Sequence, residues 1–242
     1  MVSLGMQNQR PLFQIQLLGD HAIVYKKLSA LVEDIDLDLL AFNQYVKNEK
    51  IKGVKDIILA YDTLTLIYDI IQFDANPFLV AHQILETFSS SNIHVEQNEK
   101  KPIIEIPVCY DPSLGIDLKE AAIIANCSIE GLIQKHTEHI YSVYCLGFLP
   151  GFAYMGDVPN KIQLPRHPKP RAKVFAGSVG IAGKQTGIYP MDSPGGWQII
   201  GRTPIKIFDP VKLSLFKAGD RVRFNSIDLA MFHQLNNQED VH

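Results

Sequence analysis

The sequence predicts an α+β protein with two domains, residues 1–98 and residues 99–242. Up to about residue 100 the chain alternates between strand and helix patterns, which favours a ferredoxin-like α/β domain. The composition then changes, because 10 of the 16 glycines and 9 of the 14 prolines lie between Cys145 and Pro210. Short apolar runs among so many turn residues are typical of a β-barrel or sandwich with long loops. The polar stretch EQNEKK, residues 96–101, is the expected linker.

Two hairpins and a helix are predicted at the start of the chain. Two short strands flank the Gly19-Asp20 turn, and a second β-rich run, residues 54–70, is broken at Asp62-Thr63. Between these hairpins, apolar residues recur at helical spacing and form one stripe: Ile35, Leu39, Phe42 and Val46.

A second helix is predicted from Pro77 onward. Asn76 is a suitable N-cap, and proline is favoured at the first helical position because its missing amide hydrogen is not needed there. The apolar face of this helix is expected to comprise Phe78, Ala81, Ile84, Leu85 and Phe88. The order β-α-β-β-α, with a further strand near 93–96 or 103–108, is the split β-α-β arrangement of ferredoxin-like domains.

The second half opens with a strand at residues 102–110 that could belong to either domain. Asp117 and Glu120 then have the spacing of a capping box, which predicts a helix start. Ser128 is a suitable N-cap for the helix that follows. The region rich in glycine and proline begins after these helices.

Composition excludes several classes of protein. Lys plus Arg is 23 and Asp plus Glu is 26, a net charge of −3 that argues against a general nucleic-acid binder. Three cysteines without a CxxC pair argue against a disulfide scaffold or zinc site and favour a reducing compartment. The N-terminus lacks a signal-peptide pattern, and no apolar run approaches the ~20 residues of a membrane helix. We therefore expect a soluble cytoplasmic protein that binds neither nucleic acid nor membranes.

A phosphate-binding loop is the first sharp interpretation of the glycine-rich region, and it fails. In the Walker pattern a Ser or Thr follows the lysine, but here Gln185 follows Lys184, and Ser178 occupies the place of the first glycine. The next residues, GIYPMDSPGG, would break any helix at once. The helix N-terminus that makes such a loop bind phosphate is therefore missing.

A nucleophilic serine and a metal site are also disfavoured. Ser178 directly follows Gly177, so the spacing of a nucleophile elbow is absent. His136 and His139 lie three apart on a predicted helix, but no third ligand is marked, and a solvated helix end is the favoured interpretation. We expect no metal site.

What remains is a concentration of polar side chains beside glycine and proline. A basic group lies in PRHPKPRAK: Arg166, His167, Lys169, Arg171 and Lys173. A second group lies in the turns that follow: Lys184, Gln185, Thr186, Tyr189, Asp192, Ser193 and Arg202. Because turns hold such donors rigidly, they suit a small anionic or amide-bearing ligand. A basic rim that keeps the protein soluble is the alternative.

Aromatic residues could close the other side of the same pocket. They lie in GFLPGFAYMGDVP: Phe148, Phe152 and Tyr154. Gly195 and Gly196 allow a close approach of the backbone just before Trp197. The alternatives are a plain barrel core for the aromatic segment and a core position for Trp197.

These segments resemble a known family. The stretches GFLPGFAYMG, LPRHPKPRAKV and AGSVGIAGKQTGIYPMDSPGGWQIIGRTP look like the signature of the allophanate hydrolase subunit 1 family. That family includes the B subunits of bacterial 5-oxoprolinases and KipI-type inhibitors of sensor kinases. The resemblance is nearly continuous from Tyr144 to Pro210 and extends more thinly to LGDHAIVY and IPVCYDPSLGIDL. One departure is Phe175, where the family usually has proline.

The resemblance implies a small α/β domain followed by a cyclophilin-like β-barrel. It also implies an ATP-dependent 5-oxoprolinase that cleaves 5-oxo-L-proline to L-glutamate together with a carboxylase-related C subunit and a TIM-barrel-like A subunit. ATP with Mg²⁺ would be used by the complex, and no bound cofactor is expected in the isolated chain. Two alternatives remain: an inhibitor that binds a sensor histidine kinase, and a component of an allophanate or urea-amide hydrolase. The implied fold alone does not argue for prolyl isomerase activity.

The chemistry of lactam opening assigns expected roles to these residues. Phosphorylating the lactam oxygen needs positive charge against the phosphoryl oxygens, and Lys184 and Arg202 are the expected catalytic residues. Gln185, Thr186 and Ser193 are expected to orient the lactam or phosphate. The full set expected to bind substrate is Phe152, Tyr154, Arg166, His167, Gln185, Thr186, Tyr189, Asp192, Ser193, Gly195 and Trp197.

Overall fold

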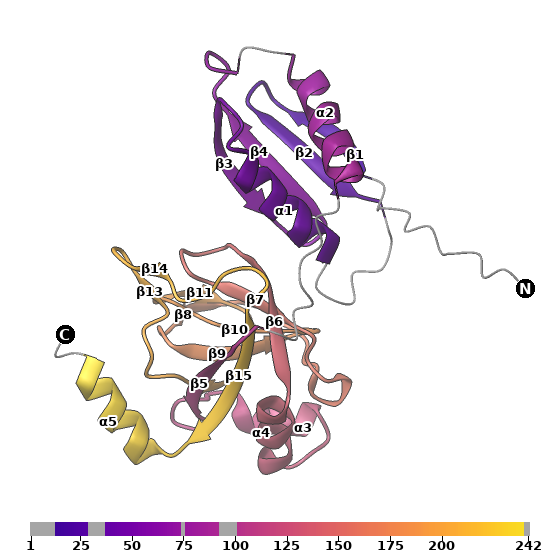
Figure 1. The fold of residues 1–242 in the computed structure, drawn as a ribbon. Coiled ribbons are helices and arrows are strands. Elements are labelled where there is room, and N and C mark those ends of the chain that lie inside the picture. Colours follow the sequence, from indigo (N-terminus) through magenta and orange to yellow (C-terminus); the bar gives the residue numbers. More distant parts are fainter. Residues whose placement is uncertain (1–12, 29–36, 74–75, 92–100, 240–242) are drawn as a thin grey trace, which may run out of the picture. The chain divides into compact units, whose positions relative to one another are not determined.

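The computed structural model describes residues 13–28, 37–73, 76–91 and 101–239 (Figure 1). The chain divides into two compact units, Met1–Gln97 and Asn98–His242. Each unit has a hydrophobic core of its own.

The first unit is built on a four-stranded sheet whose neighbouring strands are all antiparallel. In sheet order the strands are β1 (Phe13–Leu18), β2 (Ala22–Lys27), β4 (Thr63–Tyr68) and β3 (Val54–Leu59). Both predicted hairpins are confirmed: β1 pairs with β2 across Gly19, which has a φ of +64°, and β3 pairs with β4.

The predicted ferredoxin-like order is not confirmed in full. β2 and β3 flank β4, which is the split arrangement, but the edge beside β2 is occupied by β1 from the N-terminal hairpin. A strand was expected there from the segment after the second helix. Residues 93–96 lie outside the described part of the chain, and residues 103–108 belong to a strand of the second unit.

The two helices of the first unit are α1 (Leu37–Glu49) and α2 (Pro77–Ser90). The N-cap prediction for α2 is confirmed, because Oδ1 of Asn76 accepts hydrogen bonds from the amides of Phe78 and Leu79. Most of the predicted apolar stripes are buried: Leu39, Phe42, Val46, Ala81, Ile84 and Phe88. Phe78 was expected on the buried face but is 45% exposed in the first helical turn; Ile35 lies outside the described residues.

The second unit contains a closed barrel of seven strands, in the order β10-β7-β6-β15-β5-β12-β9 (Figure 1). Their bounds are β5 (Ile103–Cys109), β6 (Ile140–Leu146), β7 (Ala153–Gly156), β9 (Ser178–Ala182), β10 (Gln185–Ile188), β12 (Gln198–Arg202) and β15 (Arg221–Ile227). The β5–β15 pair is parallel. The predicted barrel is confirmed, and the strand that the sequence left unassigned, β5, belongs to it.

Short helices and two-stranded ribbons surround the barrel. The helices are α3 (Leu118–Ile124), α4 (Ile129–Glu138), η2 (Asn160–Ile162) and α5 (Leu229–Glu239). The ribbons pair β8 (Arg171–Val174) with β11 (Ser193–Gly195) and β13 (Phe208–Asp209) with β14 (Leu213–Ser214). No described helix combines the length and apolar character needed to cross a bilayer.

Caps at the two helix starts behave differently. Oγ of Ser128 accepts a hydrogen bond from the amide of Gly131, so the predicted cap of α4 is confirmed. Asp117 precedes α3, but its side chain makes no capping bond to that helix. The capping-box prediction is therefore wrong, because this carboxylate is used by residues far away in the sequence.

Candidate functional site

A chain of hydrogen bonds runs through the barrel interior. Oγ1 of Thr186 donates to the carbonyl of Gly180 at 3.0 Å and lies 2.9 Å from Nε2 of His136. Because the hydroxyl hydrogen is already used, Nε2 must be the donor to Thr186, and Nδ1 then accepts from the Tyr110 hydroxyl at 2.8 Å. Burial lowers the pKa of His136 to about 3, so the ring is neutral.

This network corrects two predictions. His136 was interpreted as part of a solvated helix end, but its exposure is 0%, because α4 turns this side chain into the barrel unit. Thr186 was expected to orient substrate, but it is also 0% exposed, and its hydroxyl is fully used within the protein. Both residues hold α4 against β10.

Three of the expected substrate-binding aromatics form a second core outside the barrel. Phe152, Tyr189 and Trp197 are 1%, 1% and 6% exposed, and Val174 of the β8–β11 ribbon joins the cluster. The Phe152 ring meets the rings of Trp197 and Tyr189 edge to face, with centroids 5.3 and 5.4 Å apart. These residues serve as packing and do not line an open pocket.

Glycines make this aromatic packing possible. A Cβ at Gly187 would lie 2.7 Å from the carbonyl oxygen of Ala153 and 3.4 Å from the Trp197 ring. At Gly195 it would overlap the Tyr189 hydroxyl. The glycine-rich sequence thus lets aromatic rings lie directly on the backbone, a reason that turn chemistry alone did not suggest.

The exposed rim of the aromatic cluster contains Tyr154, Arg166 and Phe148. Burial raises the pKa of Tyr154, and the nearby charge of Arg166 partly opposes that rise. Phe148 is 61% exposed at a φ of +70°, a conformation that is uncommon for a bulky residue. Arg166 and Tyr154 therefore do lie close together, as the sequence suggested, but at the edge of a packed cluster.

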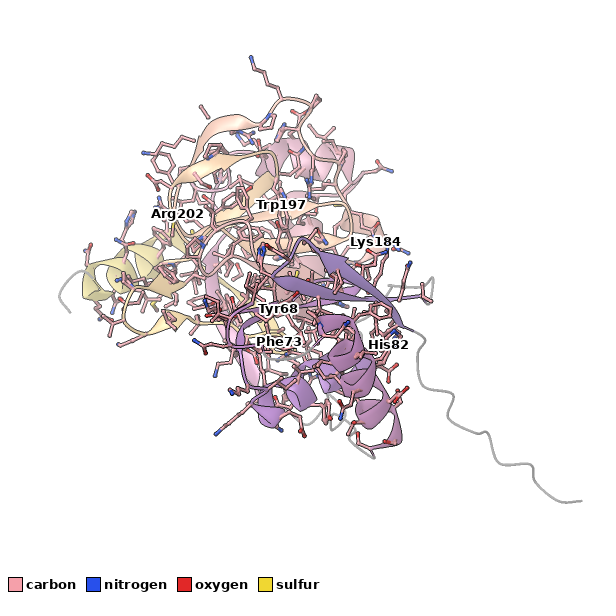
Figure 2. All side chains as sticks on the ribbon, turned by 90° about the horizontal axis from the view of Figure 1, so that it is seen from above. Tyr68, Phe73, His82, Lys184, Trp197 and Arg202 are labelled. Carbon is pink, nitrogen blue, oxygen red and sulfur yellow. The ribbon has the colours of Figure 1, made fainter. Side chains whose placement is uncertain are left out.

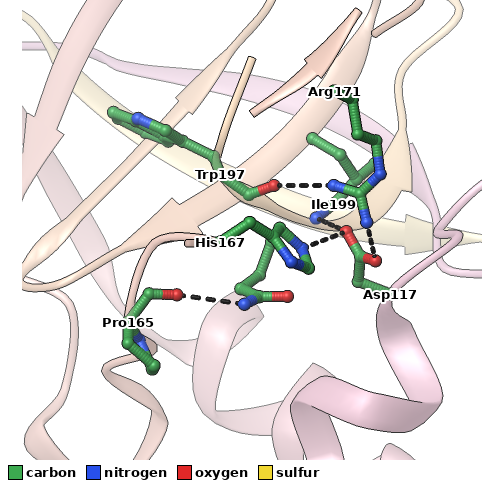
Figure 3. Close-up of polar contacts among 7 residues, drawn as sticks. Asp117, Pro165, His167, Arg171, Trp197 and Ile199 are labelled. Atoms are coloured by element: carbon green, nitrogen blue, oxygen red, sulfur yellow. Dashed lines mark hydrogen bonds and ion pairs between the residues drawn. The ribbon is translucent and has the colours of Figure 1, made fainter. Parts of the chain in front are cut away.

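A polar cluster that the sequence did not reveal joins the start of α3 to β12 (Figure 3). We call it the Asp117 cluster: Asp117, His167, Arg171 and Gln198. The Asp117 carboxylate pairs with the Arg171 guanidinium and accepts the amide of Ile199 at 2.7 Å. Its side chain is only 7% exposed, so the ion pair is largely shielded from water.

His167 and Gln198 complete this cluster (Figure 3). Nε2 of His167 lies 3.3 Å from Oδ2 of Asp117, an ion-pair distance whose geometry is not that of a hydrogen bond. Nε2 of Gln198 donates to the carbonyl of Pro165 at 3.0 Å, while Oε1 has no partner among the residues that the structure describes. The cluster fastens the loop before β8 to the barrel wall.

A second charged group lies at the far end of β8. We call it the Arg202 cluster: Lys173, Phe175, Asp192 and Arg202. Asp192 accepts the Ala176 amide at 2.9 Å through Oδ1 and pairs with Nζ of Lys173 at 2.8 Å through Oδ2. The Lys173 partner is the main cause that lowers the pKa of Asp192. This carboxylate, left open by the sequence as base, metal ligand or cap, therefore holds a turn.

Arg202 lies on the other side of that turn. Its Nε donates to the carbonyl of Ala176 at 2.7 Å, and its Cζ lies 5.6 Å from the centroid of the exposed Phe175 ring. Nζ of Lys173 lies 4.7 Å from the same centroid. Ser193 is buried beside Asp192, and its hydroxyl donates to the carbonyl of Pro194 at 3.2 Å.

Lys184 and Arg202 do not converge on one cavity. Gln185, next to Lys184, pairs with Ala182 at one end of β9, whereas Arg202 pairs with Ser178 at the other end. Four residues of strand correspond to about 13 Å. Figure 2 shows the two cationic side chains on either side of Trp197. The expected shared site of Lys184, Gln185 and Arg202 is therefore corrected: Lys184 lies on the β9–β10 turn.

No group of three or more His, Cys, Asp or Glu side chains within the described ranges is placed to hold a metal ion. The three cysteines, all in described segments, form no disulfide. The chemistry that this surface offers is therefore that of arginine, lysine and histidine side chains beside aromatic rings.

A family model described as "Carboxyltransferase domain, subdomain C and D" matches residues 13–216. The chain belongs to this carboxyltransferase family. The match covers most of the first unit and most of the barrel, but it ends before β15.

Curated relatives of this carboxyltransferase-family chain carry a specific name. It is 38% identical over 231 residues to the B subunit of 5-oxoprolinase from Bacillus subtilis (strain 168), covering 91% of this chain and 95% of that one. The same name belongs to a Haemophilus influenzae protein, 38% identical over 77% of this chain and 84% of its own length. A urea amidolyase of Lachancea kluyveri is 27% identical over 79% of this chain but only 11% of that protein.

Solved structures of family relatives agree with the fold. The protein TTHA0988 is 33% identical, with a TM-score of 0.74 over 86% of this chain, and this chain spans only 40% of that protein. PH0987 from Pyrococcus horikoshii is 38% identical, with a TM-score of 0.53 over 90% of this chain and 100% of its own.

Proposed function

We propose that this chain is the B subunit of an ATP-dependent 5-oxoprolinase complex that opens 5-oxo-L-proline to L-glutamate. The observation that carries the proposal is the 38% identity to the B subunit of a 5-oxoprolinase over 91% of this chain and 95% of that one. An alignment of nearly full length matches both units and not a shared domain alone. Because the relative is named as one component of a multi-chain enzyme, we further propose that the chain acts with partner chains, the A and C subunits.

The reaction requires the activation of an unreactive amide. Phosphorylation of the lactam oxygen by ATP with Mg²⁺ creates a leaving group, and water then attacks the ring carbon. Such a transfer is promoted by fixed positive charge near the reacting oxygens. The Arg202 cluster and Arg166 are exposed sources of such charge on this chain. Lys184 would have to act at a separate point, because β9 separates it from Arg202.

Reconstitution of the complex tests this proposal. The chain is co-expressed with the proteins encoded beside it, a carboxylase-related C subunit and a TIM-barrel-like A subunit, and glutamate release from 5-oxoproline is measured with and without ATP. We expect release only with ATP and only when all three chains are present. Glutamate release that is unaffected by omitting this chain would reject the proposal.

Two alternatives are separated by the same preparation. The urea amidolyase likeness covers a small part of that protein and supports a urea-amide hydrolase less; turnover of allophanate but not 5-oxoproline would favour it. A KipI-type role predicts instead that the chain captures a sensor histidine kinase in a pull-down and inhibits its autophosphorylation.

Finer structural and cellular assignments belong to this proposal. We propose that the barrel is cyclophilin-like and that the first unit is a ferredoxin-like variant whose edge strand comes from the N-terminal hairpin. A cytoplasmic location fits cysteines that form no disulfide.

A further inference from the structure

Arg202 uses only part of its hydrogen-bonding capacity. Its Nε donates to the carbonyl of Ala176, which fixes the plane of the guanidinium group. Within the described residues, neither terminal nitrogen of the group has an acceptor. Partial burial lowers the pKa of Arg202, which shows that its charge is incompletely solvated and that nearby Asp192 does not fully compensate for it.

The surroundings of this guanidinium combine positive charge with an apolar surface. Phe175 is 53% exposed and is held between the Lys173 ammonium and the Arg202 guanidinium. Asp192 is the acidic member of the cluster, and both of its oxygens are already engaged, by Lys173 and by the Ala176 amide. With two cations and one anion, the cluster retains one positive charge.

A fixed guanidinium with its terminal nitrogens available is the usual partner of a carboxylate, which it binds through two parallel hydrogen bonds. The exposed Phe175 ring beside it offers contact to a small apolar body. A compact cyclic acid has both features: one carboxylate and a small ring.

We propose that Arg202 binds the carboxylate of 5-oxoproline while Phe175 contacts its ring. This inference rests on the proposed 5-oxoprolinase function and assigns to Arg202 substrate recognition rather than stabilisation of phosphoryl charge. Lys173 has a supporting role, since its ion pair with Asp192 holds the turn that carries Phe175.

The first test compares 5-oxoproline with its carboxamide, which keeps the lactam but lacks the carboxylate. In the reconstituted complex the wild type is expected to show a KM about 10- to 150-fold lower for the acid than for the amide, the range of charge-assisted hydrogen bonds. Arg202→Gln is expected to raise the KM for the acid by the same factor and to leave the KM for the amide within about twofold. Arg202→Lys, which keeps the charge without the fork, is expected to be intermediate.

Controls separate recognition from structure. Arg223→Gln removes an arginine from a surface pair with Glu105 and is expected to change neither KM. If Arg202 only supports the loop, Arg202→Gln raises both KM values equally, and the proposal is overturned. It is also overturned if the variant weakens assembly of the complex and affects both substrates alike, because the guanidinium then binds a carboxylate of a partner protein.

A second readout does not require turnover. The side-chain Nε–H signal of Arg202, assigned by its loss in Arg202→Lys, is followed by NMR in the isolated chain and in the complex as each compound is added. A shift with the acid and not with the amide supports the carboxylate site even if the wild-type complex fails to open 5-oxoproline, which would reject only the proposed function. An active wild-type complex whose Arg202→Gln variant keeps the acid preference rejects only the Arg202 inference.

Discussion

Nε2 of His136 lies 2.9 Å from Oγ1 of Thr186, so a residue of α4 is hydrogen-bonded to a strand of the barrel. The Tyr110 hydroxyl satisfies the other ring nitrogen, and the Gly180 carbonyl accepts the threonine hydroxyl. Every polar atom of this buried chain therefore has a partner, which is the condition under which such a network stabilises a core.

Replacing Thr186 by valine should break this chain without changing the size of the side chain. The His136 N–H and the Gly180 carbonyl would both lose their partner, and we expect a loss of about 1–3 kcal/mol in the free energy of unfolding, measured with urea. Thr137→Val is the control, since that hydroxyl bonds only to carbonyls of its own helix. Equal effects of the two substitutions would contradict the assigned role of the buried network.

Stability should fall as the pH drops from about 6.5 toward 3. The pKa of His136 is lowered to about 3 in the folded protein, whereas an unfolded histidine titrates near 6.5. Between these values the unfolded chain binds a proton that the folded chain does not, so unfolding becomes easier as pH falls, by up to about 1.4 kcal/mol per pH unit. His136→Gln should remove this contribution from urea unfolding curves. The ring signals of His136 should also stay unchanged by NMR down to pH 4; a transition near pH 6 would refute the prediction.

Gly195→Ala should disturb the aromatic core. Its Cβ would overlap the Tyr189 hydroxyl, and we expect a destabilisation of about 1–3 kcal/mol, typical of overpacking, together with changed fluorescence of Trp197, the single tryptophan. Gly147→Ala is the matched control, because its Cβ would meet nothing closer than 4.0 Å. Unchanged stability and emission in Gly195→Ala would show that the cluster is loosely packed.

Asp117→Asn should loosen the loop before β8. Removing a buried carboxylate leaves the Arg171 guanidinium without its partner, and such losses cost about 3 kcal/mol or more. Glu105→Gln breaks an exposed pair with Arg223 and should cost less than about 1 kcal/mol. Urea unfolding of both variants tests the difference; similar costs would mean that the Asp117 cluster is effectively solvated.

Lys184 and Arg202 should act independently. Since they lie at opposite ends of β9, the losses in kcat/KM of the complex caused by Lys184→Ala and Arg202→Ala should add, as free energies, to within about 0.5 kcal/mol in the double variant. Strong non-additivity would restore the idea of one shared cavity.

Local sequence signals predicted local structure well. The caps at Asn76 and Ser128, and the turn at Gly19, depend on residues within a few positions of each other, and all three are present. The barrel was predicted from the density of turn residues, although its strand order was not. Parallel pairing of β5 with β15 joins segments more than a hundred residues apart, and no local pattern encodes it.

The site was harder to predict because residue type does not reveal direction. Asp117 has the spacing of a helix cap, yet it bonds Arg171 and Ile199, far along the chain. Phe152, Tyr189 and Trp197 suggested a pocket wall but pack against one another, since facing glycines leave room for them. Arg166 and Arg202 remain exposed to a ligand, while Thr186 does not.

The parallel β5–β15 pair also has a consequence for synthesis on the ribosome. β15 lies between β5 and β6, so the barrel wall stays open until residues 221–227 have left the exit tunnel. The sheet and helices of the first unit are complete by Ser90 and can form while most of the barrel is still untranslated. During that interval nascent chains expose the unpaired edges of β5 and β6, and this is the stage at which chaperone binding would protect the protein most.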